Sequence, residues 1–380
     1  MIKYTTLGNL IAPAKVIRCG KGSFPVLSMT MHDGIVLQSE RFKKSLASID
    51  QSDYKVVKRG QLVVGFPIDE GVLYVQKAAD EGIMSPAYNV WDIDTEKVDA
   101  DFLELCLHSP QSMQYYKDKL RGTTARRRSI PTADLLALRI RLPDMQTQRE
   151  VVAIMRKTEA VIAARQEQLN SFEQLVKSRF IELFGDPILN PNGWKTEKAE
   201  THIDLLSGFP FDSSQYTESG DNICGGLIIM PQRIEWNDCK HWCSIEGYEE
   251  YALKKNDIVI ALDRPWISEG FKIAMVDAEH LPALLIQRTA RIRAIGISQF
   301  YLMYCFLLGG FDKHCNITGS LVPHISAKDI RSFSIMLPPL ELQEQFATFV
   351  EQVDKSKLAV QKGLQELELL KKSLMQQYFG

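Results

Sequence analysis

The chain has 380 residues, which exceeds the usual size of one domain and leaves room for two or more hydrophobic cores. With 45% hydrophobic and 24% charged residues it has the composition of a folded globular protein, which excludes a fibrous or wholly disordered chain. A net charge of -2 does not by itself favour nucleic acid, because duplex DNA attracts basic surfaces, but a long chain can carry a basic patch on one face.

The first residues and the cysteines indicate the compartment. Residues 1–6 lack the basic and then apolar pattern of a signal peptide, and no stretch of about 18 apolar residues could span a bilayer. The seven cysteines are irregularly spaced, which fits reduced thiols better than a disulfide framework. We therefore expect a cytoplasmic protein.

The first globular region, residues 1–141, has the pattern of a mixed domain of helices and strands. Residues 61–65 form a short apolar run typical of a strand, and a loop containing glycine follows at residues 67–71. Residues 102–107 are apolar enough for a buried helix. The sequence therefore predicts an α+β domain here.

A basic segment closes this region. Residues 117–128 place six basic side chains in twelve positions, with two threonines and a glycine between them. Arginine offers paired donors to a guanine edge or a phosphate, and threonine hydroxyls can reach phosphates. The alternative is an ordinary solvated loop. The candidate DNA-binding residues of this segment are Lys119, Arg121, Thr123, Thr124, Arg126, Arg127 and Arg128.

A long helix is predicted over residues 142–185. Its apolar residues recur at steps of three and four, a proline lies just inside its start and a glycine lies at its end. A helix of about 40 residues is roughly 60 Å long, which is too long for the inside of a small domain. It needs a second long helix to pack against.

The second globular region, residues 186–336, repeats the order of the first. An apolar run at residues 257–261 is followed by a loop at residues 263–270 and a helix-like stretch at residues 300–306. The place equivalent to the basic segment, residues 316–324, keeps a glycine and hydroxyls but lacks the arginines. The candidate DNA-binding residues of this region are Arg264, Trp266, Lys272, Ser320 and His324.

The end of the chain repeats its middle. Leu142-Pro143 recurs as Leu337-Pro338, and the same offset of 195 continues without a gap for 44 residues to the end. Helices of equal length and phase predict an antiparallel coiled coil with pseudo-twofold symmetry and one globular region at each end. The alternative is that the helices merely join two copies of the protein.

This order of variable region, helix, variable region and helix resembles the specificity subunit of type I restriction-modification systems over the whole chain. The resemblance rests on the Leu-Pro-x-x-x-x-Gln start of both helices and on residues 192–195 and 207–213 at the opening of the second half. It implies an α+β fold with two target recognition domains, residues 1–141 and 186–336. It also implies helices at residues 142–185 and 337–380 that space these domains.

The resemblance further implies partners and a role without catalysis. Each target recognition domain would read one half of a two-part DNA sequence, and the helices would dock two modification subunits, which are methyltransferases. Restriction subunits would join through that assembly. Two homologous loops with different side chains would then read different bases.

Sequence features of enzymes are weak in this chain. Residues 263–266 superficially resemble a methyltransferase motif, but no glycine-rich loop for S-adenosylmethionine accompanies them. Cys239, His241 and Cys243 could bind zinc, but structural zinc normally takes four ligands. Residues 20–23 lack the spacing of a nucleotide-binding loop. We therefore expect no catalytic residue, metal or cofactor. The alternative function is a free-standing coiled-coil DNA-binding regulator or adaptor.

Overall fold

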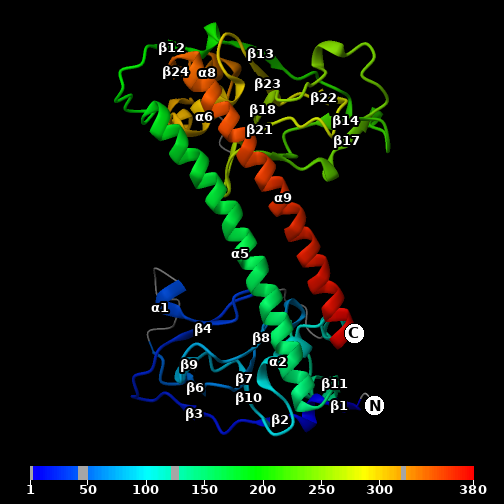
Figure 1. Cartoon of the computed structure of the whole chain (residues 1–380). Helices are drawn as coiled ribbons and strands as arrows, with labels where there is room; N and C mark the ends of the chain where they lie inside the picture. The colour runs from blue at the N-terminus through cyan, green and yellow to red at the C-terminus, as the bar shows by residue number, and fades with distance from the viewer. Residues whose placement is uncertain (1–2, 42–49, 121–127, 318–321) are drawn as a thin grey trace. The chain divides into compact units, whose positions relative to one another are not determined.

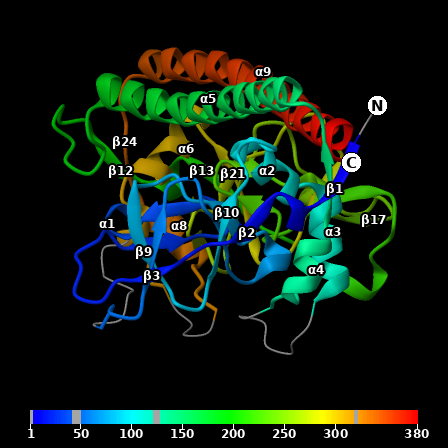
Figure 2. The same cartoon turned by 90° about the horizontal axis from the view of Figure 1, so that it is seen from below.

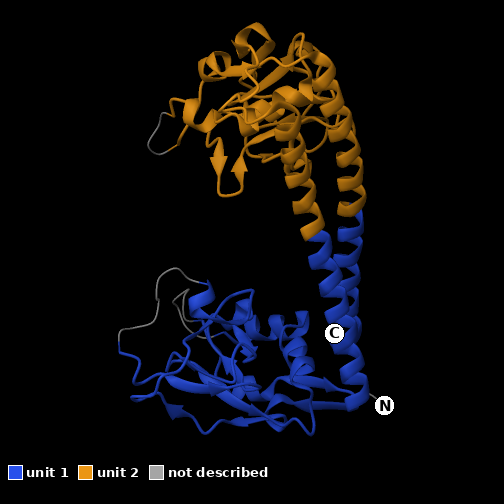
Figure 3. Cartoon of the chain, turned by 60° about the vertical axis from the view of Figure 1, so that its left-hand side comes forward, with its two compact units in different colours: residues 1–166, 362–380 blue, residues 167–361 orange. Residues whose placement is uncertain are grey.

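The computed structural model describes residues 3–41, 50–120, 128–317 and 322–380 (Figure 1). The chain forms two compact units, one of residues 1–166 and 362–380 and the other of residues 167–361 (Figure 3). Strands and helices occur in both units, which confirms the predicted α+β class. Within the described ranges, no helix is long and apolar enough to cross a membrane.

The first unit is built around a four-stranded antiparallel sheet in the order β2-β10-β7-β8. Its bounds are Ile11–Pro13 for β2, Asn89–Ile93 for β10, Leu62–Val64 for β7 and Leu73–Val75 for β8. A separate ribbon pairs β1 (Lys3–Thr6) with β11 (Arg139–Leu142).

Smaller sheets and short helices complete this unit. The remaining strands are β3 (Ile17–Arg18), β4 (Leu27–Met29), β5 (Ile35–Leu37), β6 (Lys55–Lys58) and β9 (Glu81–Met84). The helices are α1 (Gln38–Arg41), α2 (Ala100–Leu107), α3 (Pro110–Lys119) and α4 (Thr132–Ala137).

The second unit repeats the main sheet in the order β13-β23-β18-β21, again antiparallel. Its bounds are Ile203–Ser207 for β13, Thr289–Ala294 for β23, Ile258–Ala261 for β18 and Ile273–Met275 for β21. The edge ribbon recurs as β12 (Thr196–Lys198) with β24 (Ser334–Met336). The two halves of the sequence therefore fold on one plan.

Smaller sheets also complete the second unit. Their strands are β14 (Asp221–Cys224), β15 (Ile229–Met230), β16 (Arg233–Ile234), β17 (Lys240–Trp242), β19 (Trp266–Ile267), β20 (Gly270–Phe271) and β22 (Ala283–Leu285). The helices are α6 (Gln299–Leu308), α7 (Phe311–His314) and α8 (Ala327–Ser332).

The two long helices are α5 (Met145–Phe184) and α9 (Leu340–Phe379), each of 40 residues. In the first unit the start of α5 packs beside the end of α9, where Lys371 pairs with Glu159 at 2.7 Å. In the second unit the end of α5 meets the start of α9, and the rings of Phe180 and Phe346 lie 5.4 Å apart. Within each unit the helices are thus antiparallel and run side by side (Figure 2).

The Leu-Pro-x-x-x-x-Gln motif has the same structural role in both units. The Gln148 side chain accepts a hydrogen bond from the Asp99 amide at 2.8 Å and donates to the Pro143 carbonyl at 2.9 Å. Gln343 accepts from the Ser298 amide at 2.9 Å and donates to the Pro338 carbonyl at 2.8 Å. Asp99 and Ser298 are the N-caps of α2 and α6. Each glutamine therefore ties the start of a long helix to the start of a domain helix.

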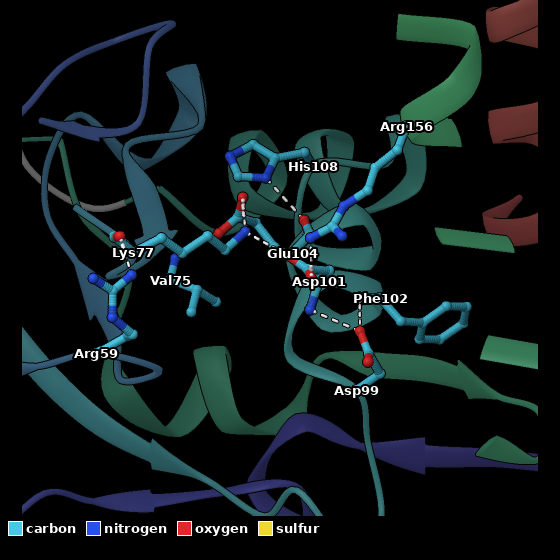
Figure 4. Close-up of polar contacts among 9 residues, drawn as sticks. All are labelled: Arg59, Val75, Lys77, Asp99, Asp101, Phe102, Glu104, His108 and Arg156. Carbon is cyan, nitrogen blue, oxygen red and sulfur yellow. Dashed lines mark hydrogen bonds and ion pairs between the residues drawn. The ribbon is translucent and has the colours of Figure 1, made fainter. Parts of the chain in front are cut away.

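Ion pairs add a second connection between α5 and the domain in the first unit (Figure 4). Arg156 of α5 pairs with Asp101 of α2, and Asp101 also pairs with Lys77 at 2.6 Å. Lys77 in turn pairs with Glu104 at 3.1 Å, whose other oxygen accepts from the Val75 amide at 2.6 Å. These contacts link the long helix, α2 and the edge strand β8.

The second unit makes its connection with aromatic rings. Phe180 and Phe184 of α5 are fully buried against Tyr301 of α6 and Phe346 of α9. The stacked and edge-on rings have centroids between 4.8 and 5.7 Å apart, the range that aromatic pairs prefer. The domain and both helices therefore share one hydrophobic core in this unit.

Candidate nucleic-acid interface

Two loops meet at equivalent places in the two units. In the first unit the Ile68 amide, in the loop after β7, donates to the Arg128 carbonyl at 3.1 Å. In the second unit the Arg264 amide, in the loop after β18, donates to the Pro323 carbonyl at 2.7 Å. The strand loop and the segment singled out in the sequence are therefore neighbours in both halves.

Three chain segments converge in the second unit, and we call them the loop cluster: residues 262–264, 286–288 and 323–325. Leu262 donates its amide to the Arg288 carbonyl at 2.9 Å and accepts from the Ile325 amide at 3.0 Å. Asp263 forms an isolated antiparallel bridge with His324. Backbone hydrogen bonds thus hold the three segments of the loop cluster together.

The predicted residues of the second unit occupy this cluster and the strands beside it. Arg264 is exposed and its backbone is left-handed, with φ of 46°. His324 is half-buried beside Asp263. Trp266 is half-buried and stacks on Phe271 with centroids 4.9 Å apart. Of the residues predicted to bind DNA in this unit, Arg264 is therefore a cation with an exposed side chain.

Lys272 lies beneath the cluster instead of on the surface. It is 6% exposed, and its ammonium donates to the Gly226 carbonyl. Its backbone amide donates to the Pro265 carbonyl at 2.7 Å. Burial, and after it the charge of Arg264, lowers the pKa of Lys272. These contacts join the loop after β18 to the glycine turn that precedes β15.

The predicted residues described in the first unit are paired with carboxylates. Arg128 lies 3.2 Å from Asp69, also pairs with Glu70, and has 32% of its side chain exposed. Lys119 lies 3.8 Å from Asp134, with 45% of its side chain exposed. Arg128 is placed to fix the basic segment to the loop after β7.

Several predicted residues lie outside the described residues. They are Arg121, Thr123, Thr124, Arg126, Arg127 and Ser320. Among the described residues that follow these segments, Arg128 and Pro323 accept backbone hydrogen bonds from the strand loops.

Arg288 was not predicted from the sequence, and it joins the loop cluster from the turn before β23. Its guanidinium Nε lies 3.6 Å from an Asp263 carboxylate oxygen, and 70% of its side chain is exposed. Its backbone is left-handed, with φ of 66°. The signal available in the sequence was weak, since residues 286–288 mark a turn between two apolar runs without a motif.

The residues considered for zinc make other contacts. The Cys239 thiol donates to the Asn222 side-chain oxygen at 3.2 Å, and Cys243 is exposed. In the part of the chain that the structure describes, no three histidine, cysteine or acidic side chains are grouped to hold a metal ion.

Comparison with known proteins gives consistent relatives. A family model for the type I restriction modification DNA specificity domain matches residues 243–369. The chain is 23% identical to the type I restriction enzyme MjaVIII specificity subunit of Methanocaldococcus jannaschii, over 93% of this chain and 85% of that protein. It is 29% identical to the EcoAI specificity subunit of Escherichia coli, over 50% of this chain and 34% of that protein.

Solved structures share the fold. A chain from a type I restriction-modification system solved for its assembly and conformational transition aligns with a TM-score of 0.57 at 18% identity, over 100% of this chain and 97% of that one. The type I S subunit of M. genitalium aligns with a TM-score of 0.56 at 15% identity, over 100% and 96%. Residues 243–369 therefore match the type I restriction modification DNA specificity domain, most of the chain is similar to a type I specificity subunit, and the chain shares the fold of solved type I structures.

Proposed function

We propose that this chain reads a two-part DNA sequence, one half-site for each unit, and holds modification subunits on it. The repeated pair of loops carries the proposal. The fold sets the same backbone hydrogen bond in both units, while the side chains around it differ, with Arg128, Asp69 and Glu70 in one and Arg264 and Asp263 in the other. One frame with two sets of side chains suits two different half-sites.

The proposed contacts divide by chemistry. Arg264 and the basic residues 121–127 would bind phosphates or base edges, because arginine donates to both. Arg128 and Lys272 would position the two loops, since their charged groups are already bound to Asp69, Glu70 and the Gly226 carbonyl. Trp266 and His324 would border the DNA in the second unit, and Lys119 and Ser320 would lie at its edges.

The long helices offer a surface for protein partners. Large apolar side chains on α5 and α9 are exposed, and monomeric proteins rarely gather such residues without a partner. Leu175 and Leu370 are equivalent in the internal repeat and are 48% and 47% exposed. We propose that these helix faces receive the two modification subunits, through which restriction subunits would join.

The proposal is tested by comparing the chain alone with its complex with a modification subunit. We expect the complex to bind DNA tightly, with an affinity that falls steeply as salt rises from about 50 to 200 mM because basic groups displace counterions. The isolated chain should bind weakly and without sequence preference. Failure to form a complex, together with specific binding by the chain alone, would instead indicate the free-standing regulator.

A further inference from the structure

Two exposed arginines in the loop cluster adopt a backbone conformation that side chains rarely take. Arg264 has φ of 46° and Arg288 has φ of 66°. Glycine or asparagine fits this left-handed region more easily than arginine does. Strained residues of this kind persist where the surrounding structure holds them, and they gather at functional sites. Here the hydrogen bonds of Arg264 to Pro323 and of Arg288 to Leu262 hold both.

An acidic residue lies between the two arginines. Asp263 precedes Arg264 in the chain and lies 3.6 Å from the Nε atom of Arg288. Its carboxylate is one-third exposed, and its backbone is fixed by the bridge to His324. The Arg288 side chain remains 70% exposed, so the carboxylate orients the guanidinium without covering it.

The fold itself does not require arginine at this turn. In the first unit Val64 pairs with Asn89, and in the second Ile260 pairs with Ala290. Ala87 lies two residues before Asn89, and Arg288 lies two residues before Ala290. Ala87 is therefore the counterpart of Arg288. The first unit thus has a methyl side chain at this place, without the left-handed backbone of Arg288, so the arginine and its conformation are particular to the second unit.

We infer that Arg288 is a specificity-determining residue that reads a guanine edge in the half-site of the second unit, with Asp263 as its positioning residue. The inference rests on the proposed function. A phosphate contact needs positive charge but little orientation, and the nearby carboxylate of Asp263 offsets that charge. Base reading needs the fixed fork of a guanidinium, which binds the two acceptors of guanine together, and a carboxylate partner supplies the orientation.

The test uses the full chain in complex with the modification subunit. The half-sites are first obtained by selecting bound sequences from a random DNA pool. The complex is then titrated with the selected site and with sites that carry single base-pair changes. Arg288→Gly removes the side chain and fits the left-handed backbone, so the turn is retained. Arg288→Lys keeps the charge and loses the fork.

We expect both variants to bind the selected site about 5- to 150-fold more weakly and to lose discrimination at one G·C pair of the second half-site. The dependence of binding on salt should stay as in the wild type. Asp263→Asn should reduce discrimination at the same base pair, while its thermal unfolding stays close to that of the wild type. Arg331→Ala, which removes an exposed arginine on α8 of the same unit, is the matched control and should change neither.

Other outcomes would overturn the inference. Arg288 would instead be a phosphate contact if Arg288→Gly weakened binding equally on every DNA sequence, if its salt dependence fell by about one counterion, and if Arg288→Lys restored the affinity. Unchanged discrimination in both variants would remove it from the interface. These results leave the proposed function standing. A wild-type complex that selects no two-part sequence would instead overturn the proposed function, and the inference with it.

Discussion

Replacing Gln148 with methionine tests whether the repeated glutamine fastens the long helix to the first unit. The side chain is fully buried, and methionine has nearly the same length, so the cavity left behind is small. The change leaves the Asp99 amide and the Pro143 carbonyl without their partner. Each buried group left unsatisfied costs about 1–3 kcal/mol, so for these two groups we expect the free energy of unfolding to fall by roughly 2–6 kcal/mol.

Urea unfolding followed by circular dichroism measures this loss, and amide exchange at Asp99 reports it locally. Gln146→Met, at an exposed position two residues earlier on α5, is the control and should change stability by less than about 0.5 kcal/mol. Gln343→Met should cost a similar amount in the second unit. The two effects should add, because the glutamines share no hydrogen-bond partner. A loss at Gln148 no larger than that of the control would refute this role for the motif.

Three further predictions concern the junctions and the edge of the second unit. Phe180→Ala should destabilise the second unit by about 3–5 kcal/mol in urea unfolding, because the ring is fully buried among aromatic neighbours; a loss below about 1 kcal/mol would contradict that packing. Arg156→Met should cost less than about 1 kcal/mol at low salt and nothing measurable at high salt, since its side chain is 65% exposed where it pairs with Asp101; an equal loss at high salt would argue against an ion pair. Hydrogen bonds from Lys195 and then His202 lower the pKa of Glu197 to about 2, so its stabilising contribution is complete above its usual pKa and disappears as pH falls toward 2. NMR titration should show this pKa rising in Lys195→Met, and an unchanged value would exclude that pairing.

The long helices and the duplication could be predicted because both are written locally in the sequence. An apolar period of three to four and an ungapped offset need no knowledge of distant contacts. The structure places α5 at Met145–Phe184 and α9 at Leu340–Phe379. The buried role of Gln148 and Gln343 was not predicted, because it depends on the N-caps of α2 and α6, which lie far away in the sequence.

The loop cluster shows why single site residues are harder to predict. Lys272 looks like a surface cation in the sequence, but the fold buries it against the Gly226 carbonyl, 46 residues away. Arg128 looks available, but Asp69 and Glu70 lie beside it in space. Arg288 belongs to no motif, and only the tertiary approach of Asp263 gives it an oriented side chain. Such pairings depend on how loops fold back, which composition and periodicity do not encode.

The division of DNA recognition between the two units is tested by sequencing the DNA that the complex with the modification subunit retains from a random pool. We expect two short conserved blocks separated by a gap of fixed length. We also expect Arg264→Gly, which suits the left-handed backbone of that position, to weaken the block read by the second unit and to leave the other intact. A single uninterrupted motif, or equal weakening of both blocks by that variant, would contradict the division of DNA recognition between the two units.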